Sequence, residues 1–309
     1  MVAFSPAEAF ERNLGLVSEP EQKKLAGALV SVAGCGGVGG LHAHALARIG
    51  VGRFRLADPD TFALANINRQ IGANVDTIGE NKALVTSRMI KAINPEAEVE
   101  IVENGVSAET AGSFVKDADL VVDGIDFFAI AARRQLFRAA WDANIPAVTA
   151  APLGFSSTLH VFAHGGMSFD EYFDFNDNQD CLDQIVNFAV GLAPKALHLP
   201  YMDLSSVDPK SGRGPSSIIG TQMAASLVAA AAVRIILKRG PSQLAPYFLQ
   251  IDCYRHCVRK GYLRNGNRNW SQQVKAWLFK KRICRLGWNE AFQPAFLNPL
   301  LEKEKANLA

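Results

Sequence analysis

Cysteine is scarce in this sequence, and its few copies form no pattern that predicts a disulfide or a zinc site. The 309 residues contain five cysteines, an odd number scattered along the chain. Such a set is typical of reduced thiols in a cytoplasmic protein. Cys253 and Cys257 form one C-x3-C pair with only His256 nearby, whereas a structural zinc ion usually takes its ligands from two close pairs. We therefore expect a cytoplasmic protein without zinc.

Long hydrophobic runs are also lacking. The first residues contain no basic segment followed by an apolar run, so a signal peptide is not expected. The most apolar stretch, residues 223–237, is rich in alanine and too short to span a bilayer. We predict that it forms a helix buried on all sides.

An excess of one charge is absent from the whole chain but present in one segment. The formal net charge is only +2, yet residues 253–289 contain ten Lys or Arg residues and no acid. Placed on a helix, residues 269–288 would form a basic amphipathic element. Its candidate ligands are RNA phosphates, an anionic membrane surface, or an acidic partner or leader peptide. The structural alternative is a solvated face whose aromatic residues pack against the core.

Short apolar runs alternate with helical patterns over the first half of the chain. Strands are expected at residues 27–34, 53–58, 98–103, 118–124 and 146–151. Helices are expected at residues 38–50, 79–94, 107–115 and 128–142. This alternation predicts a parallel sheet with helices on both faces.

The pattern changes after residue 151. Residues 157–163 and 247–252 read as added strands, and a helix is expected at 216–238. Residues 165–215 are irregular, with one short helical candidate at 179–190, and loops of this length usually act as lids or binding loops.

We therefore predict an α/β fold: a doubly wound, Rossmann-like, mostly parallel sheet with C-terminal antiparallel strands and a long crossover loop. Residues 1–252, including the crossover loop 165–215, would form a nucleotide-binding domain, and residues 253–309 a basic C-terminal extension.

A glycine-rich loop lies between the first strand and the first helix of this pattern. The segment "GCGGVG" (34–39) fits G-x-G-x-x-G, and Asp58 lies 19 residues after Gly39. Glycines let the backbone approach a phosphate group at the positive N-terminus of a helix, and an acid at the tip of the second strand can accept hydrogen bonds from ribose. An adenine nucleotide is therefore predicted. Its binding glycines would be Gly34, Gly36, Gly37 and Gly39.

The residues that follow the second strand favour ATP over NAD or FAD. Arg69 and Lys82 supply two cations near the expected phosphates. Attack on an α-phosphate expels pyrophosphate, and the growing negative charge needs fixed positive partners. Asn66, Asn68 and Gln70 add neutral donors for phosphate and ribose oxygens, and Asp60 is also expected to bind the nucleotide. Arg69 also has a structural alternative, an ion pair with Asp58 or Asp60, and Lys82 could simply be solvated at the start of a helix.

Asp126 is the candidate magnesium ligand. It lies two residues beyond the strand "LVVDG", at the carboxyl end of the sheet, where ligands bind in folds of this type. A carboxylate at this place can hold Mg²⁺ against phosphates. The alternative is that Asp126 caps the following helix.

These motifs resemble the ThiF/MoeB/HesA family, bacterial relatives of the ubiquitin-activating enzymes. Order and spacing agree over residues 12–163. The matching segments are "GCGGVGG" (34–40), "LADPDTFALANINRQ" (56–70), "GENKA" (79–83), "INPEAEV" (93–99) and "LVVDGID" (120–126).

The resemblance implies ATP-dependent adenylation of a carboxylate in a homodimer. By position, the residues that would contact ATP and its magnesium are Gly37, Asp58, the segment 65–69, Lys82 and Asp126. The resemblance also implies that an N-terminal arginine reaches into the partner subunit's site. Arg12, 22 residues before Gly34, stands at that place, and its structural alternative is a solvated helix arginine.

The sequence departs from the family pattern at two places. Phe127 follows the magnesium aspartate where family members often have an amide. The two C-x-x-C zinc pairs of the sulfur-carrier activators are absent. Some relatives use a cysteine of the crossover loop, where Cys181 is the only cysteine. Its acidic neighbours Asp177, Asp180 and Asp183 would raise the thiol pKa, which argues against a reactive thiolate.

Two classes of function follow from these residues. The first is adenylation of a carboxylate, with release of pyrophosphate, on the C-terminus of a small carrier protein, on a peptide, or on a modified nucleoside. The second is a NAD(P)- or FAD-binding oxidoreductase on the same fold. The identity of the carboxylate and of the nucleophile that accepts the acyl group stays open.

Overall fold

The core of the protein is one mixed sheet. The computed structural model describes residues 4–240 and 243–288, and within them the sheet has nine strands in the order β3-β2-β1-β4-β5-β7-β8-β9, with β6 paired to β7. The strands are β1 Leu29–Ala33, β2 Arg53–Ala57, β3 Glu98–Val102, β4 Leu120–Asp123, β5 Ala147–Thr149, β6 Pro152–Leu153, β7 Ser156–Phe162, β8 Tyr247–Asp252 and β9 Cys257–Tyr262.

The strands that the alternating pattern predicted form the parallel half of this sheet. β3, β2, β1, β4 and β5 pair in parallel, with Val30 opposite Phe54 on one side and Leu120 on the other. All residues of β1 are buried, as expected for a central strand covered on both faces. β7, β8 and β9 continue the sheet in antiparallel pairing. The predicted fold class is confirmed.

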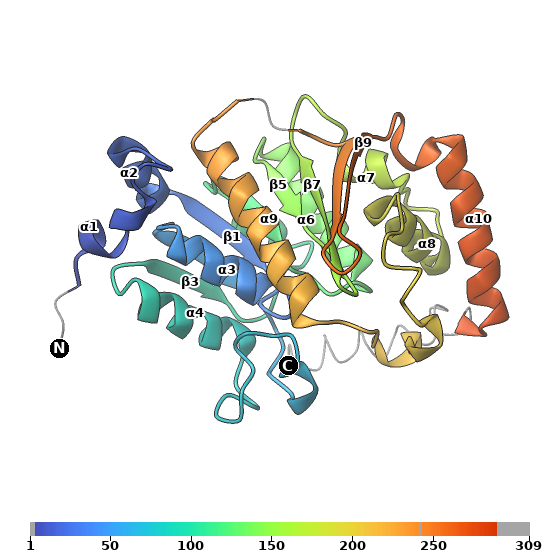
Figure 1. Cartoon of the computed structure of the whole chain (residues 1–309), viewed down its shortest axis with the longest axis horizontal. Coiled ribbons are helices and arrows are strands. Elements are labelled where there is room, and N and C mark those ends of the chain that lie inside the picture. The colour runs from blue at the N-terminus through green and yellow to red at the C-terminus, as the bar shows by residue number, and fades with distance from the viewer. Residues whose placement is uncertain (1–3, 241–242, 289–309) are drawn as a thin grey trace.

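Helices cover both faces of the sheet. In Figure 1, α3, α4 and α9 lie in front of it and α6 lies behind. Each layer has its own apolar core, one beneath α3 and α9 and one beneath α5, α6, α7 and α8. The α-helices are α1 Pro6–Ala9, α2 Glu19–Gly27, α3 Gly39–Arg48, α4 Lys82–Ile93, α5 Ala111–Val115, α6 Ile130–Asp142, α7 Phe169–Phe173, α8 Cys181–Leu192, α9 Ile218–Ile236 and α10 Trp270–Arg285. Short 3-10 turns are η1 Glu11–Asn13, η2 Leu64–Asn66, η3 Leu204–Ser206, η4 Pro209–Ser211 and η5 Gly266–Arg268.

The prediction that residues 223–237 form a helix buried on all sides is wrong. By length and composition, α9 is the one helix in the described part of the chain that could cross a membrane, yet only 39% of its apolar window is buried. Its small residues, among them Ala224, Ala225 and Ala232, pack against α3 and the sheet. Its opposite face, which begins with Ile218 and Ile219, is exposed. Apolar composition alone did not reveal that this helix covers the sheet from outside.

The crossover loop 165–215 contains more structure than the sequence pattern indicated. α8 matches the predicted helix at 179–190, and α7 is an additional helix capped by Ser168. Ion pairs fasten the loop to α6: Arg134 contacts Asp170 and Asp177, and Arg138 contacts the same two carboxylates. The loop is therefore attached firmly to the helical layer behind the sheet.

The segment 253–309 begins inside the sheet. β9 was not predicted, and it pairs with β8 from Tyr247 opposite Tyr262 to Asp252 opposite Cys257. The proposed boundary between residues 252 and 253 thus falls within a β-hairpin, and β9 completes the sheet of the first domain. α10, which the basic amphipathic pattern indicated, follows and packs against α8.

Candidate active site

The glycine loop is shaped by two of its four glycines. Gly34 has a positive φ of 85°, and a Cβ placed on it would overlap the carbonyl oxygen of Gly124. A Cβ on Gly39 would overlap the carbonyl oxygen of Gly34. Gly36 and Gly37 are less crowded, since a Cβ on them would meet only side chains at 3.6 and 3.9 Å. Gly34 and Gly39 therefore let the loop pack against the end of β4. Gly36 and Gly37 leave the backbone open to a ligand at the start of α3.

Asp58, at the end of β2, holds the glycine loop in place. It is buried, and its Oδ2 accepts the backbone N–H of Cys35 at 2.6 Å while its Oδ1 accepts that of Asp60 at 2.9 Å. Burial raises the pKa of Asp58, and the nearby charge of Lys82 opposes that rise. A carboxylate has lone pairs beyond these two bonds, so the predicted contact with ribose is compatible with this role but is not shown by it.

Lys82 lies beside the glycine loop rather than in solvent. It is the first residue of α4, whose N-cap Asn81 accepts two backbone N–H groups and donates to the carbonyl of Asp58. The Lys82 Nζ is buried and pairs with Asp60 Oδ2 at 2.8 Å. The charge of Lys82 also lowers the pKa of Cys35, although burial of that thiol outweighs it. The solvated alternative for Lys82 is therefore wrong.

Arg69 lies close enough to Asp126 for the two charges to interact. It is half-buried, which lowers its pKa, while the negative charge of Asp126 raises it. Its Nη1 donates to the carbonyl of Ala65 and to Asn68 Oδ1, both at 2.9 Å. Asp60 pairs with Lys82 and Asp58 with backbone amides, so the alternative ion pair of Arg69 with either acid is not formed.

The polar residues around Arg69 differ in what they offer a ligand. Gln70 is buried, its side chain faces Gly36, and its Oε1 has no hydrogen-bond partner. Such an atom is costly unless a ligand or water supplies a donor. The Oδ1 of Asn66 accepts the N–H of Ala63 and thereby caps the turn, so this oxygen already has a hydrogen-bond partner within the protein. Asn68 donates to the carbonyl of Ser216 at 3.0 Å and is exposed.

Asp126 is exposed in the loop between β4 and α6. Its Oδ1 accepts the backbone N–H of Phe128 at 3.0 Å, so part of the predicted capping alternative is real: the carboxylate stabilises the turn that precedes α6. The negative charge of Asp126 also acts on Arg69. The same residue can thus shape its loop and still offer an oxygen to a cation.

Arg133 is a residue of this site that the sequence reading missed. Its Nε donates to Asp123 Oδ2 at 2.8 Å, and the two side chains are 4% and 2% exposed. Its other nitrogens donate to the carbonyls of three consecutive residues, Ile125, Asp126 and Phe127. A signal existed: Arg133 is a charged residue spaced three and four residues from Ile130 and Phe137 on the buried face of α6.

The guanidinium of Arg133 also connects this loop to the crossover region. It lies 4.5 Å from the ring centroid of Phe188 on α8. Phe127, the residue after Asp126, packs its ring 5.3 Å from the same Phe188. Arg133 and the aromatic contacts of Phe127 and Phe188 therefore hold the loop that carries Asp126.

The start of α9 is the second feature that the sequence reading missed. Ser217 caps the helix and donates to the carbonyl of Gly154 at 2.8 Å. Thr221 Oγ1 lies 3.4 Å from the carbonyl oxygen of Arg69, and its methyl group is the nearest neighbour that a Cβ on Gly37 would meet. A helix N-terminus thus stands next to the glycine loop, although no local pattern links residue 221 to residue 37.

Arg12 is not brought to this site within one chain. It lies in η1, and the adjacent Asn13 donates to the carbonyl of Ile49 at the C-terminal end of α3. The glycine loop opens the N-terminal end of the same helix, about 15 Å away for its ten residues. A role of Arg12 in a partner's site stays a prediction.

Two further predictions concern the reactivity of Cys181 and the presence of a metal site. Cys181 begins α8, and its pKa is raised first by burial and then by Asp180, so a reactive thiolate is not favoured. Among the described residues, no group of three or more His, Cys, Asp or Glu side chains is arranged to hold a metal ion.

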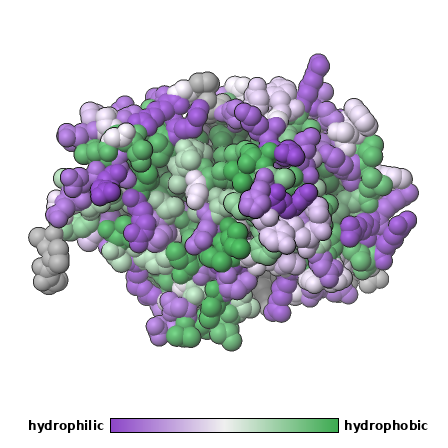
Figure 2. Space-filling model, viewed as in Figure 1, coloured by the Kyte–Doolittle hydropathy of each residue, from purple (hydrophilic) through white to green (hydrophobic). Residues whose placement is uncertain are grey.

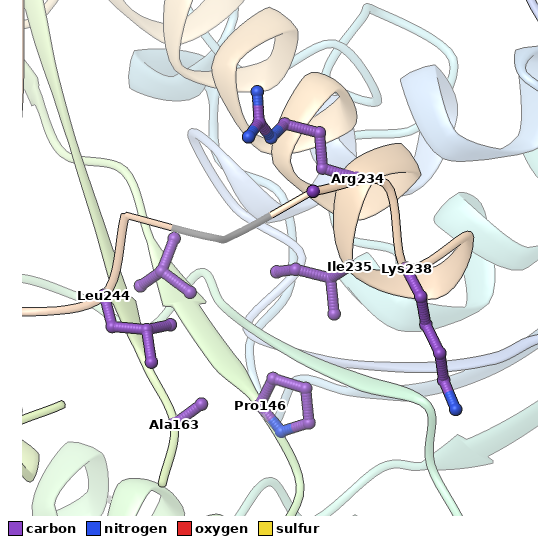
Figure 3. Close-up of a pocket in the computed structure, with 8 residues that line it drawn as sticks. Pro146, Ala163, Arg234, Ile235, Lys238 and Leu244 are labelled. Atoms are coloured by element: carbon purple, nitrogen blue, oxygen red, sulfur yellow. The ribbon is translucent and has the colours of Figure 1, made fainter. Parts of the chain in front are cut away.

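A hollow elsewhere in the fold is unrelated to these residues. It measures about 290 Å³ and lies beside Pro146, which precedes β5, and the C-terminal end of α9. Figure 3 shows Pro146, Ala163, Ile235 and Leu244 around it, with Arg234 on α9 and Lys238 on the segment that follows α9. Because Pro146 is at the start of a parallel strand, the hollow lies at the edge of the sheet opposite the glycine loop.

Comparison with known proteins places this arrangement in a family. Over 104 residues the chain is 41% identical to the tRNA threonylcarbamoyladenosine dehydratase of Haemophilus influenzae, covering 33% of this chain and 40% of that protein. It is 33% identical over 140 residues to the sulfur carrier protein ThiS adenylyltransferase of Escherichia coli, covering 45% and 55%. The matches thus span about half the length of these relatives.

Solved structures share the fold at lower sequence identity. The crystal structure of PaaA has a TM-score of 0.64 at 20% identity and covers 85% of this chain and 84% of its own. The Escherichia coli tRNA N6-threonylcarbamoyladenosine dehydratase in complex with AMP has a TM-score of 0.56 at 22% identity, covering 77% and 99%. The family model of the ThiF family matches residues 10–269. The chain therefore belongs to the ThiF family.

Proposed function

We propose that this protein activates a carboxylate by adenylation with ATP. The observation that carries the proposal is the pair of cations around one glycine loop: Lys82 on the β2 side and Arg69 on the side of Asp126. A phosphate chain bound along the loop would pass between them. An AMP-bound relative with the same fold and a relative named as an adenylyltransferase support this choice.

The geometry fits a nucleotide at three points. Gly36 and Gly37 leave room for a phosphate at the N-terminus of α3. The unpartnered Oε1 of Gln70 faces the same place and would gain a donor there, from a ligand hydroxyl or a bound water. Asp126 places a carboxylate near Arg69.

The chemistry then follows from charge. An oxygen of the substrate carboxylate attacks the α-phosphorus, the bond from that phosphorus to the bridging oxygen breaks, and pyrophosphate leaves with the electron pair. Lys82 and Arg69 would neutralise the charge that grows on the departing pyrophosphate. Asp60 holds the Lys82 ammonium in position before ATP binds. The product is an acyl-adenylate, ready for attack by an acceptor nucleophile.

Magnesium would be held by Asp126 together with phosphate oxygens and water. The ion shields the phosphates and orients them when bound. One carboxylate suffices, since Mg²⁺ in nucleotide sites commonly takes most of its ligands from phosphate and water. Arg133 would act indirectly, by fixing the backbone on either side of Asp126.

We further propose that the protein works as a homodimer in which Arg12 completes the partner's site. Arg12 is remote from its own glycine loop. Next to that loop, exposed apolar side chains gather on the turn after β2 and at the start of α9: Leu64, Ile67, Val75, Ile78, Ile218 and Ile219. Figure 2 shows hydrophobic residues over the face that carries α9. A patch of this kind is typical of a protein interface.

The substrate carboxylate would belong to a carrier-protein C-terminus, a peptide or a modified nucleoside. Relatives support each class by name: a ThiS adenylyltransferase, MccB crystallised with MccA, and a tRNA threonylcarbamoyladenosine dehydratase. A cytoplasmic location is part of this proposal. The oxidoreductase alternative is weaker, because a hydride-transfer enzyme has little use for two cations at the phosphates.

Exchange of labelled pyrophosphate into ATP tests the proposal. With ATP, Mg²⁺ and each candidate carboxylate, the protein should incorporate label into ATP. Arg69→Ala should reduce the rate about 100-fold or more, as expected for loss of one charge-stabilising group. Arg88→Ala is the matched control, because Arg88 lies on α4 in an exposed pair with Glu80. Tight NADH binding without any exchange would instead indicate the oxidoreductase.

A further inference from the structure

The helix α10 packs against the rest of the protein with one face, and its opposite face is exposed. The inner face of α10 is anchored on α8: Gln272 Nε2 donates to the carbonyl of Val190 at 3.1 Å, Lys275 Nζ donates to that of Pro194 at 2.8 Å, and Ile283 is buried. These contacts fix the rotation of the helix about its axis. In Figure 1, α10 forms the outer edge of the molecule beyond α8.

Four apolar side chains stand on the outward face. Trp270, Val274, Trp277 and Leu278 are 77%, 48%, 56% and 54% exposed. Their spacing of four, three and one residues places them along one side of the helix, and we call these four residues the outer stripe. Scattered exposed apolar residues need no explanation, but a continuous stripe with two tryptophans indicates a binding surface.

Cations accompany the outer stripe. Lys281 Nζ lies 3.7 Å from the ring centroid of Trp277, and Arg285, four residues further, is exposed on the same side. Acids next to α10 act on its flank: Asp183 pairs with Lys280, and Asp180 also acts on the charge of Lys280. The outward face is therefore apolar and positive together. The same edge in Figure 2 carries hydrophilic and hydrophobic residues side by side.

The composition of this face selects among possible ligands. RNA would stack bases on the tryptophans and place phosphates on the cations, but this mode of binding makes no use of the aliphatic side chains Val274 and Leu278. A second copy of α10 would bring Lys281 and Arg285 toward like charges. A partner helix usually needs a groove to lie in, whereas α10 forms a convex edge. A flat anionic lipid surface buries aliphatic groups, accepts tryptophan at its boundary and attracts lysine and arginine.

We propose that α10 binds the surface of a membrane that contains anionic phospholipid. The helix axis lies parallel to the surface, the outer stripe enters the boundary between headgroups and acyl chains, and Lys281 and Arg285 contact lipid phosphates. Four apolar side chains alone bind weakly, so attachment needs both the stripe and the cations and is reversible. This inference is independent of the proposed adenylation.

Co-sedimentation of the full chain with vesicles tests the proposal. The protein should bind vesicles of phosphatidylcholine mixed with phosphatidylglycerol, bind pure phosphatidylcholine vesicles far less, and lose binding at high salt. Trp270→Ser/Trp277→Ser should weaken binding to the anionic vesicles about tenfold. Lys281→Gln/Arg285→Gln should have a similar effect of about tenfold. Circular dichroism and thermal melting check that each variant is folded.

The matched control removes two exposed aromatic rings that lie outside α10. Tyr247 and Tyr262 contact each other edge to face on the β8–β9 hairpin and are about half exposed. Tyr247→Ser/Tyr262→Ser should leave vesicle binding unchanged, because these rings are not on α10. Equal loss with this control and with the tryptophan variant would show a general effect of aromatic residues and overturn the proposal.

Three other outcomes would also overturn it. One is that the wild-type protein does not co-sediment with anionic vesicles. Another is that it retains transfer RNA instead, through Trp270 and Trp277. A third is that tryptophan emission shifts to the red without vesicles when the chain is ended at residue 288, which would mean that residues 289–309 cover the outer stripe.

Discussion

Arg133 and Asp123 form a buried ion pair, with 2.8 Å between Nε and Oδ2, at the point where β4 ends and the loop of Asp126 begins. The same guanidinium satisfies the carbonyls of the next loop residues and lies over Phe188. One side chain therefore connects the sheet, the loop that carries the candidate magnesium ligand, and the crossover region.

Replacing Arg133 should affect both stability and magnesium dependence. Arg133→Met leaves Asp123 as a buried, unpaired charge, which costs about 3–5 kcal/mol, and thermal melting should show a large loss. Arg133→Lys keeps the charge but cannot reach three carbonyls at once, so it should remain folded while the Mg²⁺ concentration for half-maximal pyrophosphate exchange rises. A merely structural role would lower the melting temperature of the lysine variant without changing its Mg²⁺ dependence. Arg138→Gln, in a half-exposed pair, is the control.

The glycines of the loop should separate into two classes. Gly34→Ala and Gly39→Ala place a Cβ against backbone atoms of neighbouring residues, and overpacking of this kind costs about 1–3 kcal/mol or more. Gly37→Ala meets only the methyl group of Thr221 at 3.9 Å, so its free energy of unfolding should change by about 0.5 kcal/mol or less. Its affinity for ATP should nevertheless fall, because a methyl group would stand where a phosphate approaches. Equal unfolding energies for all three variants would contradict this division.

Mixing two inactive variants tests whether the active site is shared between subunits. Arg12→Ala and Arg69→Ala should each be nearly inactive alone. If Arg12 acts in the partner's site, a mixed dimer contains one site with both arginines, and a mixture should recover about one quarter of the wild-type activity from random pairing. Pyrophosphate exchange after joint unfolding and refolding measures this. No recovery, with mixed dimers present, would place Arg12 outside the partner's site.

His42 should make the protein sensitive to acid. Its ring is fully buried on α3 without a hydrogen-bond partner, and burial lowers its pKa from 6.5 to about 3. Below pH 6.5 the histidine binds a proton in the unfolded chain but not in the folded chain. The free energy of unfolding therefore falls as the pH falls from 6.5 toward 3. The slope from this group is about 1.4 kcal/mol per pH unit.

His42→Leu should remove this part of the acid sensitivity. Urea unfolding at several pH values would show a shallower decline for the variant, with a similar free energy at neutral pH because no hydrogen bond is lost. His160 provides the contrast: burial also lowers its pKa to about 3, but it bonds the hydroxyl of Tyr172. His160→Leu should therefore destabilise at every pH. An unchanged slope in His42→Leu would show that other groups dominate acid unfolding.

The local elements of this protein could be predicted from sequence because they depend on short-range chemistry. Apolar period and β-branched runs located the parallel strands and α3, α4 and α6 within a few residues. The glycine loop was readable because backbone approach at Gly34 and Gly39 requires glycine whatever surrounds it. Lys82 and Arg69 were predicted to lie near that loop because both follow the second strand. The charge of Lys82 acts on Cys35 of the loop, and the contact of both residues with phosphate stays a prediction.

What only the tertiary structure decided involves partners far apart in the chain. No local pattern predicts that both carboxylate oxygens of Asp58 accept backbone N–H groups. Nor does it predict that Thr221 lies beside Gly37 or that one face of α9 is exposed. In the sequence, Arg133 is indistinguishable from a solvated helix arginine. Only the packing of α6 against the sheet brings it to Asp123. A sequence encodes the conformation of each segment, but burial and pairing depend on which surfaces meet when the segments pack.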